Sequence, residues 1–274
     1  MNEIINGIRN LKNQKAMKRK LCFVLLCGLL SLSAWSQKNE VYPRPRSLQY
    51  GEGTLALTAM PEISGDVEAL GLAVDCLRSF LPDTAASGKA VRLIVGKQGD
   101  KAVRKYAKRI PPHAEGYYLK VEGEQIVIAG KDERGVLYGV RTLGQLLRDG
   151  RLPAVEITDW PEIAYRGVVE GFYGTPWSTE ARASVIRFLG EYKMNTYVYG
   201  PKDDPYHRSP NWREPYPEEE AAELRRLVEV AEESGVDFVW AIHPGQDIRW
   251  TDEDRDNLLR KFEQMYDLGV RAFA

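Results

Sequence analysis

The sequence predicts an α/β protein in which a small α+β domain precedes a truncated (β/α)8 TIM barrel. Three observations predict this class. Residues 41–158 mix short strand-like runs with two amphipathic helices, and residues after 163 repeat a strand-then-helix pattern three times. No G-x-G-x-x-G motif follows the first strand of the repeat and no P-loop occurs, which disfavours the alternative of a doubly wound nucleotide-binding sheet.

The α+β domain, residues 37–158, is predicted from local patterns. Residues 122–124, Glu-Gly-Glu, separate two strand-like runs and indicate a tight hairpin. Apolar residues recur at helical spacing in two segments, and Gly150 closes the second. The expected strands are 92–95, 117–121 and 125–129, and the expected helices are 67–80 and 134–147.

A hinge at 159–161 leads into the repeated region, residues 163–274. Ser178 and Thr251 are candidate helix N-caps, and Gly235 and Gly269 are candidate helix stops. A complete barrel takes about 250 residues, whereas 112 follow the hinge from position 163. We therefore expect three βα units and the start of a fourth strand: strands 165–169, 196–199, 237–242 and 271–274, and helices 179–192, 217–234 and 251–267.

The amino-terminal 36 residues have the pattern of an export signal. A basic cluster at 17–20 precedes an apolar run at 21–32 and a small-x-small site at 34–36. The apolar run is too short for an ordinary membrane helix, so we expect no membrane insertion after cleavage. Residues 1–16 are interpreted as an over-extended gene start. The predicted location is the periplasm or outside the cell.

Cysteine and charge narrow the range of partners. Cys27 is not preceded by the small residue that is typical of a lipoprotein anchor, so such an anchor is disfavoured. After cleavage of the signal, only Cys76 remains. The net charge is −1 overall and +5 over residues 1–36, so the remainder carries −6. An acidic body without a basic block disfavours nucleic acid as the partner. A neutral or weakly polar ligand is expected.

In barrels the chemistry lies on the loops that follow the strands, here 170–178, 200–217 and 243–250. The first combines glycines with aromatic residues suited to sugar faces, although it also fits a packed aromatic floor. In the second, Asp203 and Asp204 could form an acid/base pair or a turn. His243 in the third is typical of a hydrogen-bonded wall residue. The spacing of His113, His207 and His243 gives metal catalysis little support.

These loops carry a family resemblance. RGVVEGFYGTPW (166–177), NTYVYGPKDDPYHR (195–208) and WAIHPG (240–245) closely resemble glycoside hydrolase family 84, which contains the O-GlcNAcases and bacterial β-N-acetylglucosaminidases formerly called hyaluronidases. EGYYL (115–119) and GVLYGVRTLGQLL (135–147) resemble the non-catalytic domain that precedes such barrels in hexosaminidases.

The resemblance implies an exported retaining β-N-acetylglucosaminidase without metal or other cofactor. The substrate's acetamido group would be the nucleophile, and the partner an N-acetylglucosamine-containing glycan or glycoprotein. Gly171 and Lys202 match substrate-binding positions of the family. The catalytic Asp pair of the family follows the fourth strand and would lie beyond Ala274.

We therefore expect no catalytic residue and no activity in this fragment alone, with Asp203 and Asp204 as loop scaffolding beside Lys202. The alternative is a protein that binds N-acetylglucosamine glycans without cleaving them. The physiological substrate and the oligomeric state stay open.

Overall fold

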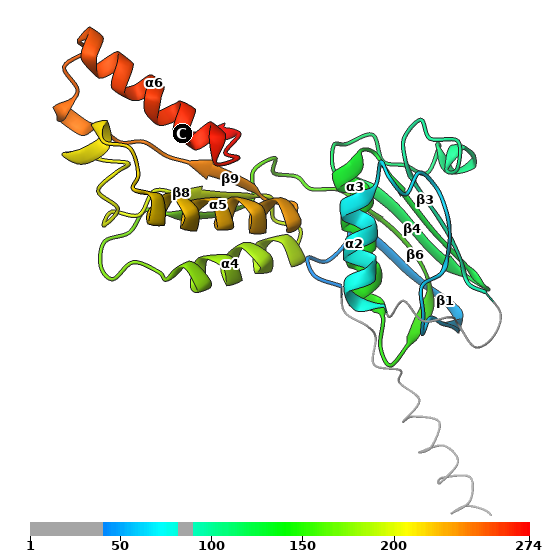
Figure 1. The fold of residues 1–274 in the computed structure, drawn as a ribbon. Coiled ribbons are helices and arrows are strands. Elements are labelled where there is room, and N and C mark those ends of the chain that lie inside the picture. The colour runs from blue at the N-terminus through cyan, green and yellow to red at the C-terminus, as the bar shows by residue number, and fades with distance from the viewer. Residues whose placement is uncertain (1–40, 82–89) are drawn as a thin grey trace, which may run out of the picture. The chain divides into compact units, whose positions relative to one another are not determined.

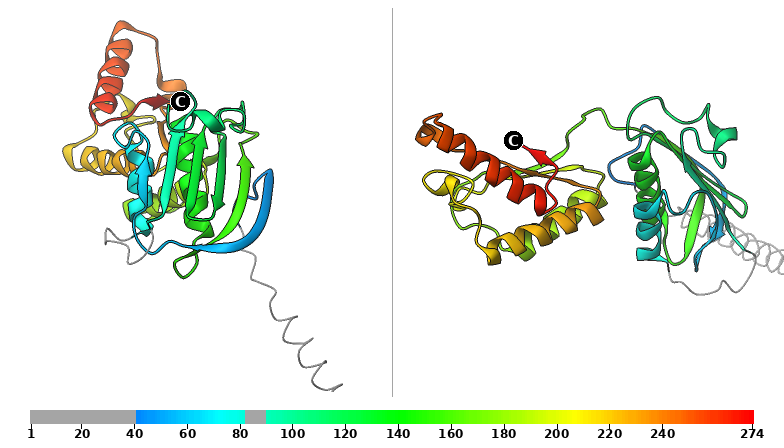
Figure 2. Two further views of the ribbon diagram at one scale, coloured as in Figure 1. Left: turned by 90° about the vertical axis from the view of Figure 1, so that its right-hand side faces the viewer. Right: turned by 45° about the horizontal axis from the view of Figure 1, so that its top comes forward.

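The first of two β-sheets lies within residues 47–159. The computed structural model describes residues 41–81 and 90–274, and the predicted export signal lies outside them. The sheet has the order β1-β6-β4-β5-β3-β2, with β1 along one edge (Figure 2, left). β4 and β5 form the predicted antiparallel hairpin. The strands are β1 Ser47–Ala56, β2 Glu62–Ser64, β3 Arg92–Lys97, β4 Tyr117–Glu122, β5 Gln125–Gly130 and β6 Arg151–Asp159.

Two helices, α2 (Gly71–Phe80) and α3 (Glu133–Leu146), lie side by side on one face of this sheet (Figure 1). The Asp132 side chain caps α3 by accepting a hydrogen bond from the Gly135 backbone N–H at 2.8 Å. The helices bury their apolar faces against the strands, as shown by the near-complete burial of Leu77, Val136, Leu143, Leu119 and Ile128.

The second sheet is parallel, with the order β10-β9-β8-β7. Its strands are β7 Gly167–Glu170, β8 Thr196–Tyr199, β9 Asp237–Trp240 and β10 Ala272–Phe273, and its connecting helices are α4 Thr179–Glu191, α5 Glu218–Glu233 and α6 Asp252–Asp267. Ser178 and Thr251 cap α4 and α6 through their hydroxyls, as the sequence predicted. Gly235 and Gly269 have positive φ angles after α5 and α6.

The structure confirms the mixed α/β class and nearly all the predicted elements, but the sequence prediction was wrong in two respects. It missed β1, β2 and β6, and α2 begins at Gly71 rather than at residue 67. In residues 41–81 and 90–274, no helix is long and apolar enough to cross a membrane.

Hydrogen bonds join the first sheet to the beginning of the second, and contacts place residues 41–274 in one unit. Glu115, in the loop before β4, accepts hydrogen bonds from Arg166 at 2.6 Å and from Asn195 at 3.0 Å. Arg134 of α3 contacts both Glu115 and Asp237 of β9. The side chains of Arg166 and Glu115 are 17% and 13% exposed, so water screens this ion pair less than an exposed one.

Lys193 is buried at the same junction, with Nζ 3.4 Å from the Tyr117 hydroxyl. Burial lowers the pKa of Lys193 to about 8, and the Asp159 carboxylate only partly opposes this shift. Below pH 8 Lys193 is charged in both states, and the folded protein must bury that charge. Between pH 8 and the ordinary pKa of 10.5, the folded protein has released the proton while the unfolded chain still binds it. Stability from this group is therefore lowest below pH 8 and rises with pH.

We expect the free energy of unfolding of the unmodified protein to rise by about 3 kcal/mol, relative to Lys193→Met, between pH 7.5 and pH 10.5. Urea unfolding at a series of pH values measures this difference, and Lys120→Met, at a half-exposed position on β4, serves as the control. A constant difference between the unmodified protein and Lys193→Met across this range would contradict the prediction.

Candidate functional site

The ends of β7 and β8 place the two predicted substrate-binding residues on adjacent loops. Gly171 directly follows β7, and Lys202 follows β8 by three residues. The Gly200 N–H donates a hydrogen bond to the Glu170 carbonyl at 3.1 Å and fixes the two strand ends to each other. The Lys202 Nζ lies 5.9 Å from the centre of the Tyr173 ring, within cation–π range. The structure thus brings Lys202 beside the loop of Gly171.

The backbone of Gly171 is open to a ligand. A Cβ added at this position would touch only Val169 Cγ1, at 3.6 Å. Two residues later, Tyr173 is 79% exposed, whereas Phe172 packs on Trp177 with ring centres 5.1 Å apart. Phe172 is 38% exposed despite this ring contact, so the Phe172 and Tyr173 rings of the loop are both open to solvent.

Asp204 has the contacts of a scaffold residue. Its carboxylate accepts hydrogen bonds from the hydroxyls of Tyr199 and Tyr216, each at 2.8 Å, and from the Tyr206 backbone N–H at 2.8 Å. Asp203 is exposed. The three donors tie the Asp204 carboxylate to β8, to Tyr216 and to its own loop, which are the contacts expected of the predicted scaffold role.

A buried ion pair beneath the Gly171 loop was missed by the sequence analysis. Glu170 is completely buried and accepts from Arg182 of α4 at 2.9–3.1 Å. The Tyr197 hydroxyl of β8 donates to the same carboxylate. A glutamate at the end of an apolar strand was the available signal, but its partners are distant in sequence.

The three histidines do not converge. His113 stacks on Trp160 in the first sheet's region, with ring centres 4.8 Å apart. His207 is buried, with Nε2 2.6 Å from the Pro201 carbonyl oxygen. His243 is exposed, and its backbone N–H donates to the His207 carbonyl. Among residues 41–81 and 90–274, no three His, Cys, Asp or Glu side chains are grouped to hold a metal ion.

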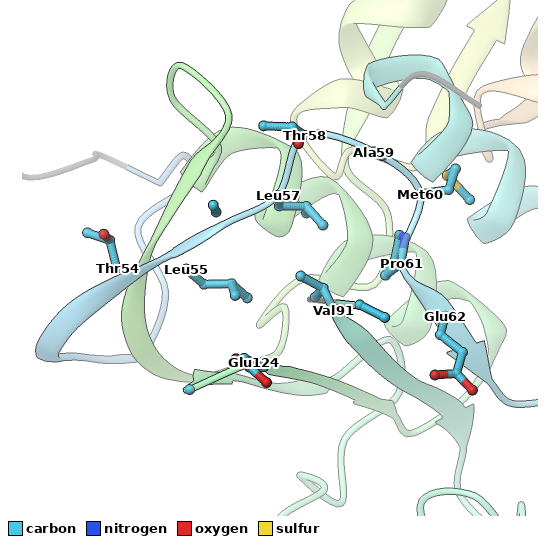
Figure 3. Close-up of a pocket in the computed structure, with 13 residues that line it drawn as sticks. Thr54, Leu55, Leu57, Thr58, Ala59, Met60, Pro61, Glu62, Val91 and Glu124 are labelled. Carbon is cyan, nitrogen blue, oxygen red and sulfur yellow. The ribbon is translucent and has the colours of Figure 1, made fainter. Parts of the chain in front are cut away.

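One cavity lies in the first sheet's region and another lies beside the loops of Gly171 and Lys202. The first, of about 630 Å³, is lined mainly by the end of β1 and the segment that joins β1 to β2, including Leu55, Leu57 and Met60 (Figure 3). Its lining combines apolar side chains with the carboxylates of Glu62 and Glu124 (Figure 3). The other, of about 320 Å³, lies beside Asp203 and Asp204 and is lined by polar and aromatic residues of α4, α5 and their loops.

Comparisons with known proteins identify the families that this chain resembles. A family described as beta-N-acetylglucosaminidase matches residues 166–274, and domain 2 of glycosyl hydrolase family 20 matches residues 38–160. Protein O-GlcNAcase of Rattus norvegicus is 46% identical over 109 residues, which are 39% of this chain and 12% of the relative.

Two solved structures resemble almost the whole chain. The structure of CpGH84B has a TM-score of 0.78 and 38% identity, and the match covers 86% of this chain and 43% of the CpGH84B chain. The structure of CpGH84D has a TM-score of 0.73 and 29% identity, and the match covers 87% of this chain and 44% of the CpGH84D chain. The chain thus spans less than half the length of both structures. On its motifs, its matched families and its fold, the chain belongs to glycoside hydrolase family 84.

Proposed function

We propose that this chain is part of an exported retaining β-N-acetylglucosaminidase in which the substrate's 2-acetamido group is the nucleophile. The observation that carries the proposal is the juxtaposition of Lys202 with the open loop of Gly171 and Tyr173 at the ends of two parallel strands. An ammonium donor, an exposed ring and an accessible backbone suit the hydroxyls and the apolar face of a pyranose. The matched families are named for hydrolases, so binding without cleavage is not favoured.

In this proposal the described residues bind and orient the sugar. Lys202 donates charge-assisted hydrogen bonds to ring hydroxyls, and the main chain at Gly171 meets the sugar closely because no side chain intervenes. The carboxylate pair that orients the acetamido group and transfers the proton follows β10 in the complete enzyme. Such a mechanism differs from the retaining scheme in which an enzyme carboxylate attacks the sugar.

The test uses the enzyme expressed from the complete gene and fluorogenic 4-methylumbelliferyl glycosides. We expect cleavage of the β-N-acetylglucosaminide, a β-configured first product by proton NMR, and much slower cleavage of the N-trifluoroacetyl analogue, whose carbonyl oxygen is a weaker nucleophile. Equal rates for both substrates would exclude acetamido participation. Binding of N-acetylglucosamine without turnover would establish the non-cleaving alternative.

We expect Lys202→Ala and Gly171→Val to weaken catalysis for different physical reasons. Removing the lysine ammonium loses a charge-assisted hydrogen bond, at about 1.5–3 kcal/mol in kcat/KM. Valine adds bulk where the ligand meets the backbone, while the open space at Gly171 leaves the fold intact. The measurement is kcat/KM on the fluorogenic substrate together with the thermal midpoint, and Lys120→Ala on β4 is the control. Unchanged kinetics in both variants would show that the sugar lies elsewhere.

We propose that the second sheet is the first part of a (β/α)8 barrel whose remaining units complete the pocket, with the domain boundary at residues 159–163. Sequential parallel strands joined by helices support this, as do the two sheet edges: within the described residues, β7 and β10 each pair on one side only. Val169 of β7 is 67% exposed, an unusual environment for valine in a barrel strand.

The corresponding test is an assay of residues 37–274 alone. We expect no turnover, because Asp204 is committed to loop hydrogen bonds and the proposed carboxylate pair follows β10. Turnover that Asp204→Asn abolishes would contradict both the barrel proposal and the scaffold role of Asp204.

We also propose that the protein is exported by its amino-terminal segment. The sequence pattern of residues 17–36 supports this. Expression in a bacterial host is expected to yield a periplasmic protein that begins near Gln37. An uncleaved protein in the cytoplasmic fraction, identified by intact mass, would contradict export.

A further inference from the structure

Two side chains hold the backbone on either side of Lys202. The His207 Nε2 lies 2.6 Å from the Pro201 carbonyl oxygen, and the Arg208 Nη1 donates to the Lys202 carbonyl oxygen at 2.8 Å. The Asp204 backbone N–H donates to the same Pro201 oxygen at 3.2 Å. Both peptide groups that flank the Lys202 Cα are thereby fixed by side-chain donors.

The surroundings of His207 identify it as a hydrogen-bond donor to the backbone. The residue is 2% exposed, and because Nε2 faces a carbonyl oxygen, Nε2 must carry the hydrogen. Its Nδ1 is buried and has no hydrogen-bond partner among the described residues. Burial also lowers the pKa of His207, although the hydrogen bond to the Pro201 carbonyl and the nearby Asp204 carboxylate act in the opposite direction. The ring is therefore neutral and directed at the main chain rather than at a substrate.

The segment that carries these donors is itself anchored. The His243 N–H donates to the His207 carbonyl at 2.7 Å, so residues 207–208 extend the pairing of the second sheet beyond β9. This bridge anchors residues 207–208, and through them the backbone at Lys202, to the chain just after β9.

We propose that His207 and Arg208 are positioning residues that hold Lys202 against the loop of Gly171 and Tyr173. The proposal rests on the proposed function, in which Lys202 contacts the sugar. A lysine side chain has many rotamers, so its reach is set by where its Cα is fixed. Because small displacements of a substrate-contacting group can reduce rates by up to about 100-fold, loss of the His207 hydrogen bond is expected to reduce catalysis measurably.

The experiment compares His207→Phe, which keeps a ring without a donor, with His207→Gln, whose amide nitrogen can replace Nε2. We expect kcat/KM of the enzyme from the complete gene to fall about tenfold in His207→Phe, mainly through KM, and to recover largely in His207→Gln. Arg208→Met, which keeps the aliphatic stem, is expected to lower kcat/KM in the same way. His113→Gln, at an exposed histidine in the first sheet's region, is the matched control.

A double-variant cycle tests whether His207 acts through Lys202. If it does, adding His207→Phe to Lys202→Ala lowers kcat/KM far less than it does in the unmodified enzyme. An equal loss in both backgrounds would overturn the proposal, as would unchanged kcat/KM in His207→Phe while Lys202→Ala is impaired.

Hydrogen exchange gives a readout that does not depend on activity. Faster amide exchange of residues 201–204 in His207→Phe, with exchange elsewhere unchanged, supports the positioning role, and unchanged exchange there overturns it. An unmodified enzyme that cleaves no N-acetylglucosaminide would contradict the proposed function alone, since the exchange result still decides the role of His207.

Discussion

Gly167→Ala is expected to prevent normal pairing of β7 with β8 and to destabilise the protein by about 4 kcal/mol or more, the range of the most damaging single substitutions. A Cβ at this position would lie 1.6 Å from the Thr196 carbonyl oxygen and 2.6 Å from its carbon. These are backbone atoms of the paired strand, so they cannot rotate away as a side chain would. The whole strand must shift to admit one methyl group.

The control is Gly71→Ala at the first residue of α2, where an added Cβ has no neighbour within 4 Å. This variant is expected to be neutral or stabilised by about 0.4–1 kcal/mol, because alanine restricts the unfolded chain. Urea unfolding followed by circular dichroism measures both. A Gly167→Ala protein with the midpoint of the unmodified protein would show that the two strands are farther apart than the structure places them.

Arg182→Met is expected to destabilise the protein by about 3–5 kcal/mol at pH 7, because it leaves the Glu170 carboxylate buried without its cation. Glu170 is fully buried, and the Arg182 side chain is 11% exposed. Glu170→Gln is expected to have a similar effect, since it leaves the Arg182 guanidinium without a counter-charge.

Two further variants distinguish the effect of a buried ion pair from that of an exposed ion pair. The double variant Glu170→Gln/Arg182→Met removes both charges and should be much more stable than the sum of the single losses indicates. Arg226→Met breaks the exposed pair with Glu180, whose side chains are 55% and 72% exposed, and should change stability by at most about 1 kcal/mol. Equal effects of Arg182→Met and Arg226→Met would contradict the structural role assigned to Glu170.

The second sheet was predictable because its signals are local. Each βα unit has its own strand run, and the caps at Ser178 and Thr251 mark where helices begin. β1 lacked such a signal, because Gly51 and Gly53 interrupt it and its register shifts between Tyr50 and Thr54. β6 contains Pro153, which pairs with β1 beyond the stretch that pairs with β4.

The candidate site was predictable only where a motif carried it. Gly171 and Lys202 came from resemblance, and the structure places Lys202 near the Gly171 loop. The partners of Glu170 could not be found in the same way, because Arg182 and Tyr197 reach it from a helix and a neighbouring strand. Contacts of that kind depend on packing, and no sequence spacing specifies them.

The hydrogen bonds of Glu115 have a consequence for the order in which the chain folds during synthesis. Its partners Arg134, Arg166 and Asn195 have all been made once translation reaches residue 195. The first sheet is then complete, so these hydrogen bonds can tie it to the segments that lead into β7 and β8 while β9 and the later units are still being translated.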